Sequence, residues 1–218
     1  MKKLVMFDMD GVLFDSMPMH SEFWVEEFAA AGVKIDRKEI YLFEGMPGRS
    51  IVPLILQKYG GGIRSKEEMD AINDRKCARV TARGPVPVMD GAREAVKAAF
   101  ELGAKCIVVT GSAQKSILER VDDVFEGRFC DKVTALDGLP GKPAPDPYLA
   151  GLRKAGICAE QAIVVENAPL GVRAAKAAGC FTIAVNTGPL PDSALLEEGA
   201  DVLLHSMREL PEFFRTLV

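Results

Sequence analysis

The sequence lacks any long apolar run, and this absence argues against a membrane-spanning protein. None of its hydrophobic segments approaches the roughly 20 residues that cross a bilayer. The first residues also lack the character of a secretion signal, because Asp8 and Asp10 interrupt the apolar stretch that such a signal needs. We therefore expect a cytoplasmic protein with no membrane partner.

A strong excess of one charge is also absent. The net charge is −4 over 218 residues, so no basic surface is predicted that would bind nucleic acid or anionic lipid. Hydrophobic residues make up 48% and charged residues 27%, which is the balance of an ordinary globular protein. The length allows one large domain or one domain with an insertion. We expect a monomer that acts on a small molecule.

Paired cysteines are lacking as well. The chain has five cysteines, an odd number, and none of them are in CxxC spacing. This pattern argues against a disulfide framework and against a cysteine-based zinc site. We expect five reduced, buried thiols, at Cys77, Cys106, Cys130, Cys158 and Cys180.

The most informative feature that is present is an apolar strand with two aspartates at its end. Residues 4–7 are all apolar, which is typical of a strand buried on both faces of a parallel sheet. Asp8, Asp10 and Gly11 come directly after it. Such a triplet also occurs in surface turns, but a surface turn needs no apolar strand before it. Ligands of α/β proteins bind at the carboxyl ends of strands, so both aspartates are candidates for chemistry.

The next part of the chain is helical throughout. Helices are predicted from Ser16 to Gly32, from Ser50 to Tyr59 and from Ser65 to about Ala82, with Trp24 and Phe28 packed inside. The sequence Gly-Pro-Val-Pro at 84–87 breaks the helical pattern and is typical of a linker. We expect residues 15–83 to form an inserted α-helical cap.

Strands then alternate with helices to the end of the chain. The expected strands cover residues 4–7, 105–109, 132–135, 162–165, 181–185 and 201–204. This alternation predicts an α/β fold, a Rossmann-like doubly wound parallel sheet with right-handed crossovers. The predicted catalytic core consists of residues 1–14 and 84–218.

Polar side chains follow three further apolar elements of this core. Thr110-Gly111-Ser112 opens a helix after the second strand, and such a turn can hold an anion on its N–H groups. Lys142 lies in a loop between a glycine and two prolines, and Glu166-Asn167 ends a later strand. Together these groups supply the chemistry that phosphoryl transfer needs. The alternative interpretations are a solvated lysine at 142 and a plain helix N-cap at Ser112.

This pattern resembles the haloacid dehalogenase superfamily, and within it the β-phosphoglucomutase-like branch with a helical cap after the first strand. The motifs that carry the resemblance are DMDGV at 8–12, the turn at 110–112, GKPAPD at 141–146 and ENAPLGV at 166–172. They occur in the order of the family, and the resemblance covers essentially the whole chain.

The resemblance implies roles for these residues. Asp8 would attack phosphorus and form an aspartyl phosphate, and Asp10 would protonate the leaving group and then activate water. The transferring phosphoryl group would be bound by Thr110, Gly111, Ser112 and Lys142. Oxygen ligands suit Mg²⁺, which would be held by Asp8, the carbonyl of Asp10, Glu166 and Asn167.

The chain departs from the family pattern at Asn167, where most relatives carry a second acid. Asparagine can ligate Mg²⁺ but adds no charge. The cap offers Glu44, just before Gly45-Met46-Pro47-Gly48-Arg49, in the loop that relatives point at the active site. Our hypothesis is that Glu44 reaches the metal when the cap closes. The alternative is a solvated loop glutamate.

A cap carboxylate in the site would take the room of a sugar, which favours a small, highly charged substrate. The subset of the family that resembles this chain includes inorganic pyrophosphatases. His20, Arg49 and Lys76 would then hold the second phosphate, although each could instead lie on a helix surface. Competing functions are a sugar-phosphate or nucleotide phosphatase, a β-phosphoglucomutase-like mutase, and a non-enzymatic binding module.

Overall fold

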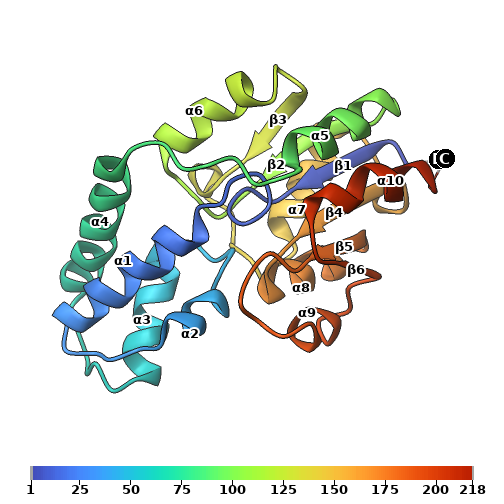
Figure 1. The fold of residues 1–218 in the computed structure, drawn as a ribbon. Coiled ribbons are helices and arrows are strands. Elements are labelled where there is room, and N and C mark those ends of the chain that lie inside the picture. The colour runs from blue at the N-terminus through green and yellow to red at the C-terminus, as the bar shows by residue number, and fades with distance from the viewer. Residues whose placement is uncertain (1, 218) are drawn as a thin grey trace.

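The computed structural model describes residues 2–217, apart from the side chain of Ser116. Six parallel strands form one sheet in the order β3-β2-β1-β4-β5-β6 (Figure 1). Their bounds are β1 (Leu4–Phe7), β2 (Lys105–Val109), β3 (Phe129–Val133), β4 (Ala162–Glu166), β5 (Phe181–Val185) and β6 (Val202–Leu204). The predicted α/β fold with a doubly wound parallel sheet is confirmed.

Helices cover both faces of this sheet. Because successive strand residues point to opposite faces, Val5 and Phe7 of β1 join the apolar cluster under α5 (Ala92–Glu101), α6 (Lys115–Val124) and α10 (Leu210–Arg215). Leu4 and Met6 join the cluster under α7 (Asp146–Ala155) and α8 (Pro169–Ala177). The short elements are α9 (Ser193–Leu196), η1 (Ala135–Asp137), η2 (Ala159–Gln161) and η3 (Met207–Glu209).

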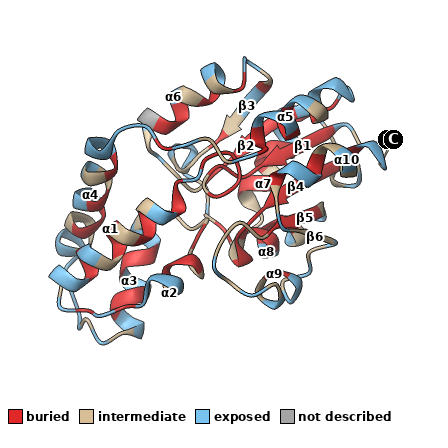
Figure 2. Cartoon of the chain, viewed as in Figure 1, coloured by how far each residue is buried: buried red, intermediate tan, exposed pale blue. Residues whose placement is uncertain are grey.

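The remaining helices pack against one another beyond one end of the sheet (Figure 1). They are α1 (Met17–Ala30), α2 (Arg37–Tyr41), α3 (Gly48–Lys58) and α4 (Lys66–Arg83). Their inward faces are buried (Figure 2) and form a separate apolar core, in which Trp24 and Phe28 stack with ring centroids 5.4 Å apart. We call residues 15–83 the cap, which has its own apolar core and contains helices but no strand.

Three details differ from the sequence-based expectations. The five-residue helix α2 was not predicted, because it is too short to show a helical period. Strand β3 begins at Phe129 rather than at 132. It lies at the sheet edge, and only its two end residues are buried, so it lacks the continuous apolar run of an inner strand. The prediction of five buried thiols is wrong for three of them. Cys106 and Cys180 are buried, Cys77 is half-buried, and Cys130 and Cys158 are exposed on the edge strand and in a loop, although all five are free.

Within residues 2–217, no helix is both long enough and apolar enough to cross a membrane.

Candidate active site

A cavity of about 610 Å³ lies between the carboxyl ends of the strands and the cap. The core contributes Asp8, Asp10 and Thr110 to its wall, and the cap contributes His20, Glu44 and Lys76. Residues predicted from distant parts of the sequence therefore share one cavity. The parallel sheet explains the core half of the site, since β1, β2 and β4 are neighbours that end at the same edge.

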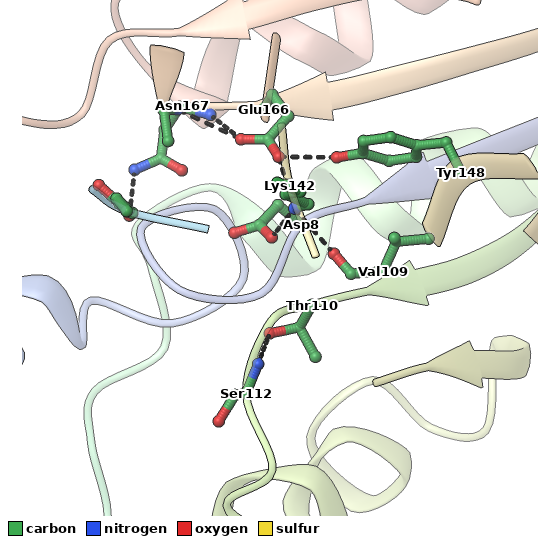
Figure 3. A network of polar contacts seen from close by, with 10 residues as sticks. Asp8, Val109, Thr110, Ser112, Lys142, Tyr148, Glu166 and Asn167 are labelled. Atoms are coloured by element: carbon green, nitrogen blue, oxygen red, sulfur yellow. Dashed lines mark hydrogen bonds and ion pairs between the residues drawn. The ribbon is translucent and has the colours of Figure 1, made fainter. Parts of the chain in front are cut away.

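Lys142 is the buried centre of the core half. Its side chain is 1% exposed, and its ammonium donates to Asp8 Oδ1, to the carbonyl of Val109 (3.2 Å) and to Glu166 Oε1 (2.6 Å) (Figure 3). Burial alone would lower the pKa of Lys142, but the charges of Asp8 and Glu166 raise it above its usual value. Lys142 is thus a permanent cation, and the alternative of a solvated loop lysine is excluded.

Asp8 lies where β1 ends, and its environment disfavours its charge. Burial raises the pKa of Asp8 well above its usual value, Lys142 opposes the shift, and the nearby charges of Glu166 and Asp10 add to it. A further cation beside Asp8 would therefore stabilise its charged form.

Asp10 is held by groups of the cap and of the segment leading to it. Ser16 Oγ donates to Asp10 Oδ1 (2.5 Å), and His20 Nε2 lies 3.3 Å from the same oxygen. Lys76 Nζ lies 2.7 Å from His20 Nδ1. An ammonium only donates, so Nδ1 must accept and the proton of the neutral imidazole is on Nε2, facing Asp10. Burial raises the pKa of Asp10, but the His20 and Ser16 bonds outweigh it and leave the pKa below its usual value.

Lys76 is costly to the fold. It is buried, with its ammonium 5.1 Å from the centre of the Trp24 ring, and burial lowers its pKa from 10.5 to about 8. Between about pH 8 and 10.5 Lys76 is protonated in the unfolded chain but not in the folded one, so stability rises with pH in this range. Below about pH 8 Lys76 is charged in both states, and the folded state bears the full cost of burying the charge. This shift of the Lys76 pKa corresponds to about 3 kcal/mol of stability.

We therefore expect the free energy of unfolding of Lys76→Met at pH 7 to exceed that of the wild type by about 3 kcal/mol. Its kcat/KM should fall. Urea unfolding at pH 7 and at pH 10.5 measures the first effect, which should vanish at the higher pH. Lys66→Met, which removes an exposed lysine of the same helix, is the control. A Lys76→Met protein less stable than the wild type at pH 7 would contradict the expectation.

Glu44 is the cap residue that enters the core half. It is buried, and its Oε1 accepts from Asn167 Nδ2 at 2.8 Å. Burial raises the pKa of Glu44 well above its usual value, and although the Asn167 bond opposes this, the charges of Asp8, Glu166 and Asp10 add to it. The alternative of a solvated loop glutamate is excluded.

Glycines let the cap loop approach the core this closely. A Cβ at Gly111 would overlap the carbonyl of Gly45, and a Cβ at Gly141 would overlap the ring of Pro47. At Gly11, whose φ is +79°, a Cβ would overlap the Asn167 amide. The cap is therefore seated on the core through close contacts that larger residues would prevent.

The turn after β2 is ordered by its own hydroxyls. Thr110 is buried and its Oγ1 accepts from the N–H of Ser112 (3.0 Å) (Figure 3). Ser112 Oγ accepts from the N–H of Gln114 (3.1 Å), and Gln114, not Ser112, is the N-cap position of α6. Gly111 and Ser112 also line the cavity.

Arg49 lies at the rim of the cavity. Its side chain is half-exposed and pairs with Asp70 (2.6 Å) and Asp74 (3.0 Å) of α4. The predicted cap residues thus divide into two groups. His20, Glu44 and Lys76 are buried at the core, and Arg49 is near solvent.

Two residues of the site were missed from the sequence. Tyr148 donates its hydroxyl to Glu166 Oε1 (2.7 Å), and Ser16 bonds Asp10 instead of capping α1. Tyr148 comes a few residues after the Gly-Lys-Pro loop in α7, and its position in the helix is that of an apolar core residue. Only the proximity to the loop could have indicated it.

The residues present fit a hard divalent cation. Within residues 2–217, no three His, Cys, Asp or Glu side chains converge as a metal cluster. The donor set is instead mixed, with two carboxylates, of Asp8 and Glu44, and an amide. Asn167 Oδ1 is buried and has no hydrogen-bond partner, although its Nδ2 is bonded. An oxygen left without a donor, on the amide that bonds the Glu44 carboxylate, suits Mg²⁺.

Fold and site together define a class: a phosphatase-type hydrolase with an α/β core and a helical cap. The chain belongs to the haloacid dehalogenase-like hydrolases, whose family model matches residues 2–179. It is 30% identical over 217 residues to the validoxylamine A 7′-phosphate phosphatase of Streptomyces hygroscopicus subsp. limoneus, with 96% of each chain covered. It is 29% identical over 205 residues to the phosphorylated carbohydrates phosphatase of Thermotoga maritima, with 92% of this chain and 93% of that one covered.

A solved structure from Bacteroides vulgatus, provisionally assigned as a β-phosphoglucomutase, superimposes with a TM-score of 0.92. The two sequences are 44% identical over 99% of this chain and 88% of that chain. These comparisons confirm the predicted superfamily, its β-phosphoglucomutase-like branch and a phosphatase enzyme, and they exclude the non-enzymatic alternative.

Proposed function

We propose that this phosphatase is a Mg²⁺-dependent phosphohydrolase that acts through an aspartyl phosphate at Asp8. Asp8 attacks phosphorus while Asp10 gives a proton to the leaving oxygen. Asp10 then takes a proton from water, which attacks the phosphorus and frees Asp8 with release of phosphate. Lys142 and the turn at Thr110 stabilise the negative charge of the transferring group.

The different partners of the two aspartates support this division of roles. Ser16 Oγ donates to Asp10 and His20 Nε2 lies 3.3 Å from it, whereas Lys142 donates to Asp8. When bound, Mg²⁺ would offset the charge of the phosphoryl group and Asp8. Asp8, the carbonyl of Asp10, Asn167 and Glu44 would hold it.

Inorganic pyrophosphate is the substrate that we propose first. The observation that carries this choice is the buried bond between Glu44 and Asn167, because it brings a cap carboxylate into the space beside the reacting groups. Lys76 and Arg49 are cations on the same cavity wall and can bind a second phosphate.

A sugar-phosphate phosphatase is the second candidate. A cavity of about 610 Å³ is larger than pyrophosphate needs and can hold a sugar ring. One relative is named for phosphorylated carbohydrates. A mutase would require in addition that the aspartyl phosphate be protected from water until a sugar phosphate arrives.

Steady-state phosphate release with Mg²⁺ separates these candidates. We expect kcat/KM for pyrophosphate to exceed that for sugar phosphates and nucleotides by about tenfold, which is about 1.4 kcal/mol. Removal of the metal with a chelator should abolish turnover of every substrate. If a sugar phosphate has the highest kcat/KM, the second candidate is favoured. Interconversion of sugar phosphates without release of phosphate would indicate a mutase.

We expect Glu44→Ala to lower pyrophosphate turnover far more than turnover of a generic phosphate ester, since Glu44 would share the metal beside a small, highly charged substrate. The measurement is kcat/KM for both substrates. Glu39→Ala is the matched control, because Glu39 is a cap glutamate that bonds Lys58 and Tyr59 instead. Equal losses of kcat/KM on both substrates would contradict a selective role of Glu44.

A further inference from the structure

Glu166 has no acceptor position left for a further partner. Its side chain is fully buried, and each of its oxygens accepts two hydrogen bonds (Figure 3). Oε1 accepts from Lys142 Nζ (2.6 Å) and from Tyr148 OH (2.7 Å). Oε2 accepts from the backbone N–H groups of Asn167 (3.0 Å) and Ala168 (3.2 Å). A carboxylate offers about four lone-pair positions, so the chain itself fills all of them.

The surroundings of Glu166 also prevent it from turning away. The Gly171 position of α8 lies so close that a Cβ there would overlap the carboxylate. The two backbone donors belong to the turn that joins β4 to α8. Glu166 is therefore fixed in orientation by the fold, whether or not anything is bound in the cavity.

Tyr148 supplies the last of the four bonds. Its ring is fully buried, lies 5.1 Å from Lys142 Nζ, and carries a hydroxyl that donates to Glu166. Tyr148 and Lys142 belong to one short segment of chain, which thus delivers two donors to the same oxygen.

Asn167 offers the opposite arrangement. Its Nδ2 is bonded to Glu44, but its Oδ1 is buried and has no donor. The next residue along the chain from Glu166 therefore has the open oxygen that Glu166 lacks.

We propose that Tyr148 is a positioning residue: its hydroxyl completes the hydrogen-bond shell of Glu166, so that this carboxylate serves as the fixed counter-ion of Lys142 and not as a metal ligand. This inference rests on the proposed function. It departs from the expectation, drawn from the family resemblance, that Glu166 ligates Mg²⁺. Lys142 has three donors and three acceptors, so a fixed Glu166 fixes the direction of the bond that Lys142 gives to Asp8.

A double-mutant cycle tests whether Tyr148 acts through Glu166. Tyr148→Phe removes one oxygen and keeps the ring. We expect it to lower kcat about tenfold, the effect of losing one supporting bond, with KM unchanged. In the Glu166→Gln background the same change should cost nothing further, because its partner is already altered. If the losses of kcat in Tyr148→Phe and Glu166→Gln multiply in the double variant, the proposal is overturned.

Calorimetric binding of Mg²⁺ to the enzyme gives a readout independent of turnover. We expect Tyr148→Phe to bind Mg²⁺ as the wild type does, and Asn167→Ala to lose more affinity than Glu166→Gln. A greater loss in Glu166→Gln would show that Glu166 is a ligand and would overturn the proposal.

Tyr59→Phe is the matched control, since Tyr59 OH makes the same kind of bond to a carboxylate, Glu39, within the cap. It should leave kcat and Mg²⁺ affinity unchanged. The proposed function is judged on the wild type alone, by whether Mg²⁺ supports phosphate release. A failure there is distinct from a failure of the variant cycle.

Discussion

Replacement of Asp8 by asparagine should lower kcat by about 10⁴-fold or more while the protein stays folded, because the amide cannot attack phosphorus. Asparagine has the shape of aspartate and still offers an oxygen to Lys142. Burial raises the pKa of Asp8, so the folded state gains from losing this charge. The free energy of unfolding should therefore be unchanged or higher.

Phosphate release and urea unfolding measure the two halves of this expectation. Asp15→Asn is the control, because Asp15 lies in the same segment but its side chain is exposed. A residual rate above about one per cent of the wild type would point to another nucleophile, given the losses usual for nucleophile removal.

The second large effect is on stability. Lys142→Met should cost about 3–5 kcal/mol of unfolding free energy at pH 7, because it leaves Asp8 and Glu166 buried without a counter-ion. The deficit should shrink as the pH falls. A buried carboxyl with a raised pKa binds its proton more readily in the folded chain than in the unfolded one, so stability rises toward acidic pH.

Urea unfolding at pH 7 and pH 5 tests both statements. Lys58→Met is the control, since Lys58 pairs with Glu39 at the surface and exposed pairs contribute about 0–1 kcal/mol. A deficit for Lys142→Met as small as that of the control, or one that grows toward pH 5, would contradict the assignment of Lys142 as the buried counter-ion.

The core half of the site was predictable because the sheet topology determines it. Asp8, Thr110 and Glu166 each lie at the end of an apolar strand, and parallel neighbouring strands end at one edge whatever their distance in sequence. Apolar runs bounded by glycines and polar residues indicated five of the six strands. β3 was misplaced because an edge strand is only half apolar.

The cap half was less predictable. The bond between Glu44 and Asn167 joins residues 123 positions apart, and no local pattern determines it. Tyr148 was missed for a different reason. An aromatic residue on the inner face of a helix looks like core packing, and only its hydroxyl, which meets Glu166, gives it another role.

Trp24 gives the cavity a practical use. It is the only tryptophan among 218 residues, it lines the cavity, and the ammonium of Lys76 lies over its ring. A cation near an indole changes its emission, so whatever moves Lys76 also changes the fluorescence of the whole protein. The chain thus contains a built-in optical probe, and substrate entry or cap opening can be timed in a stopped-flow instrument without attaching a dye.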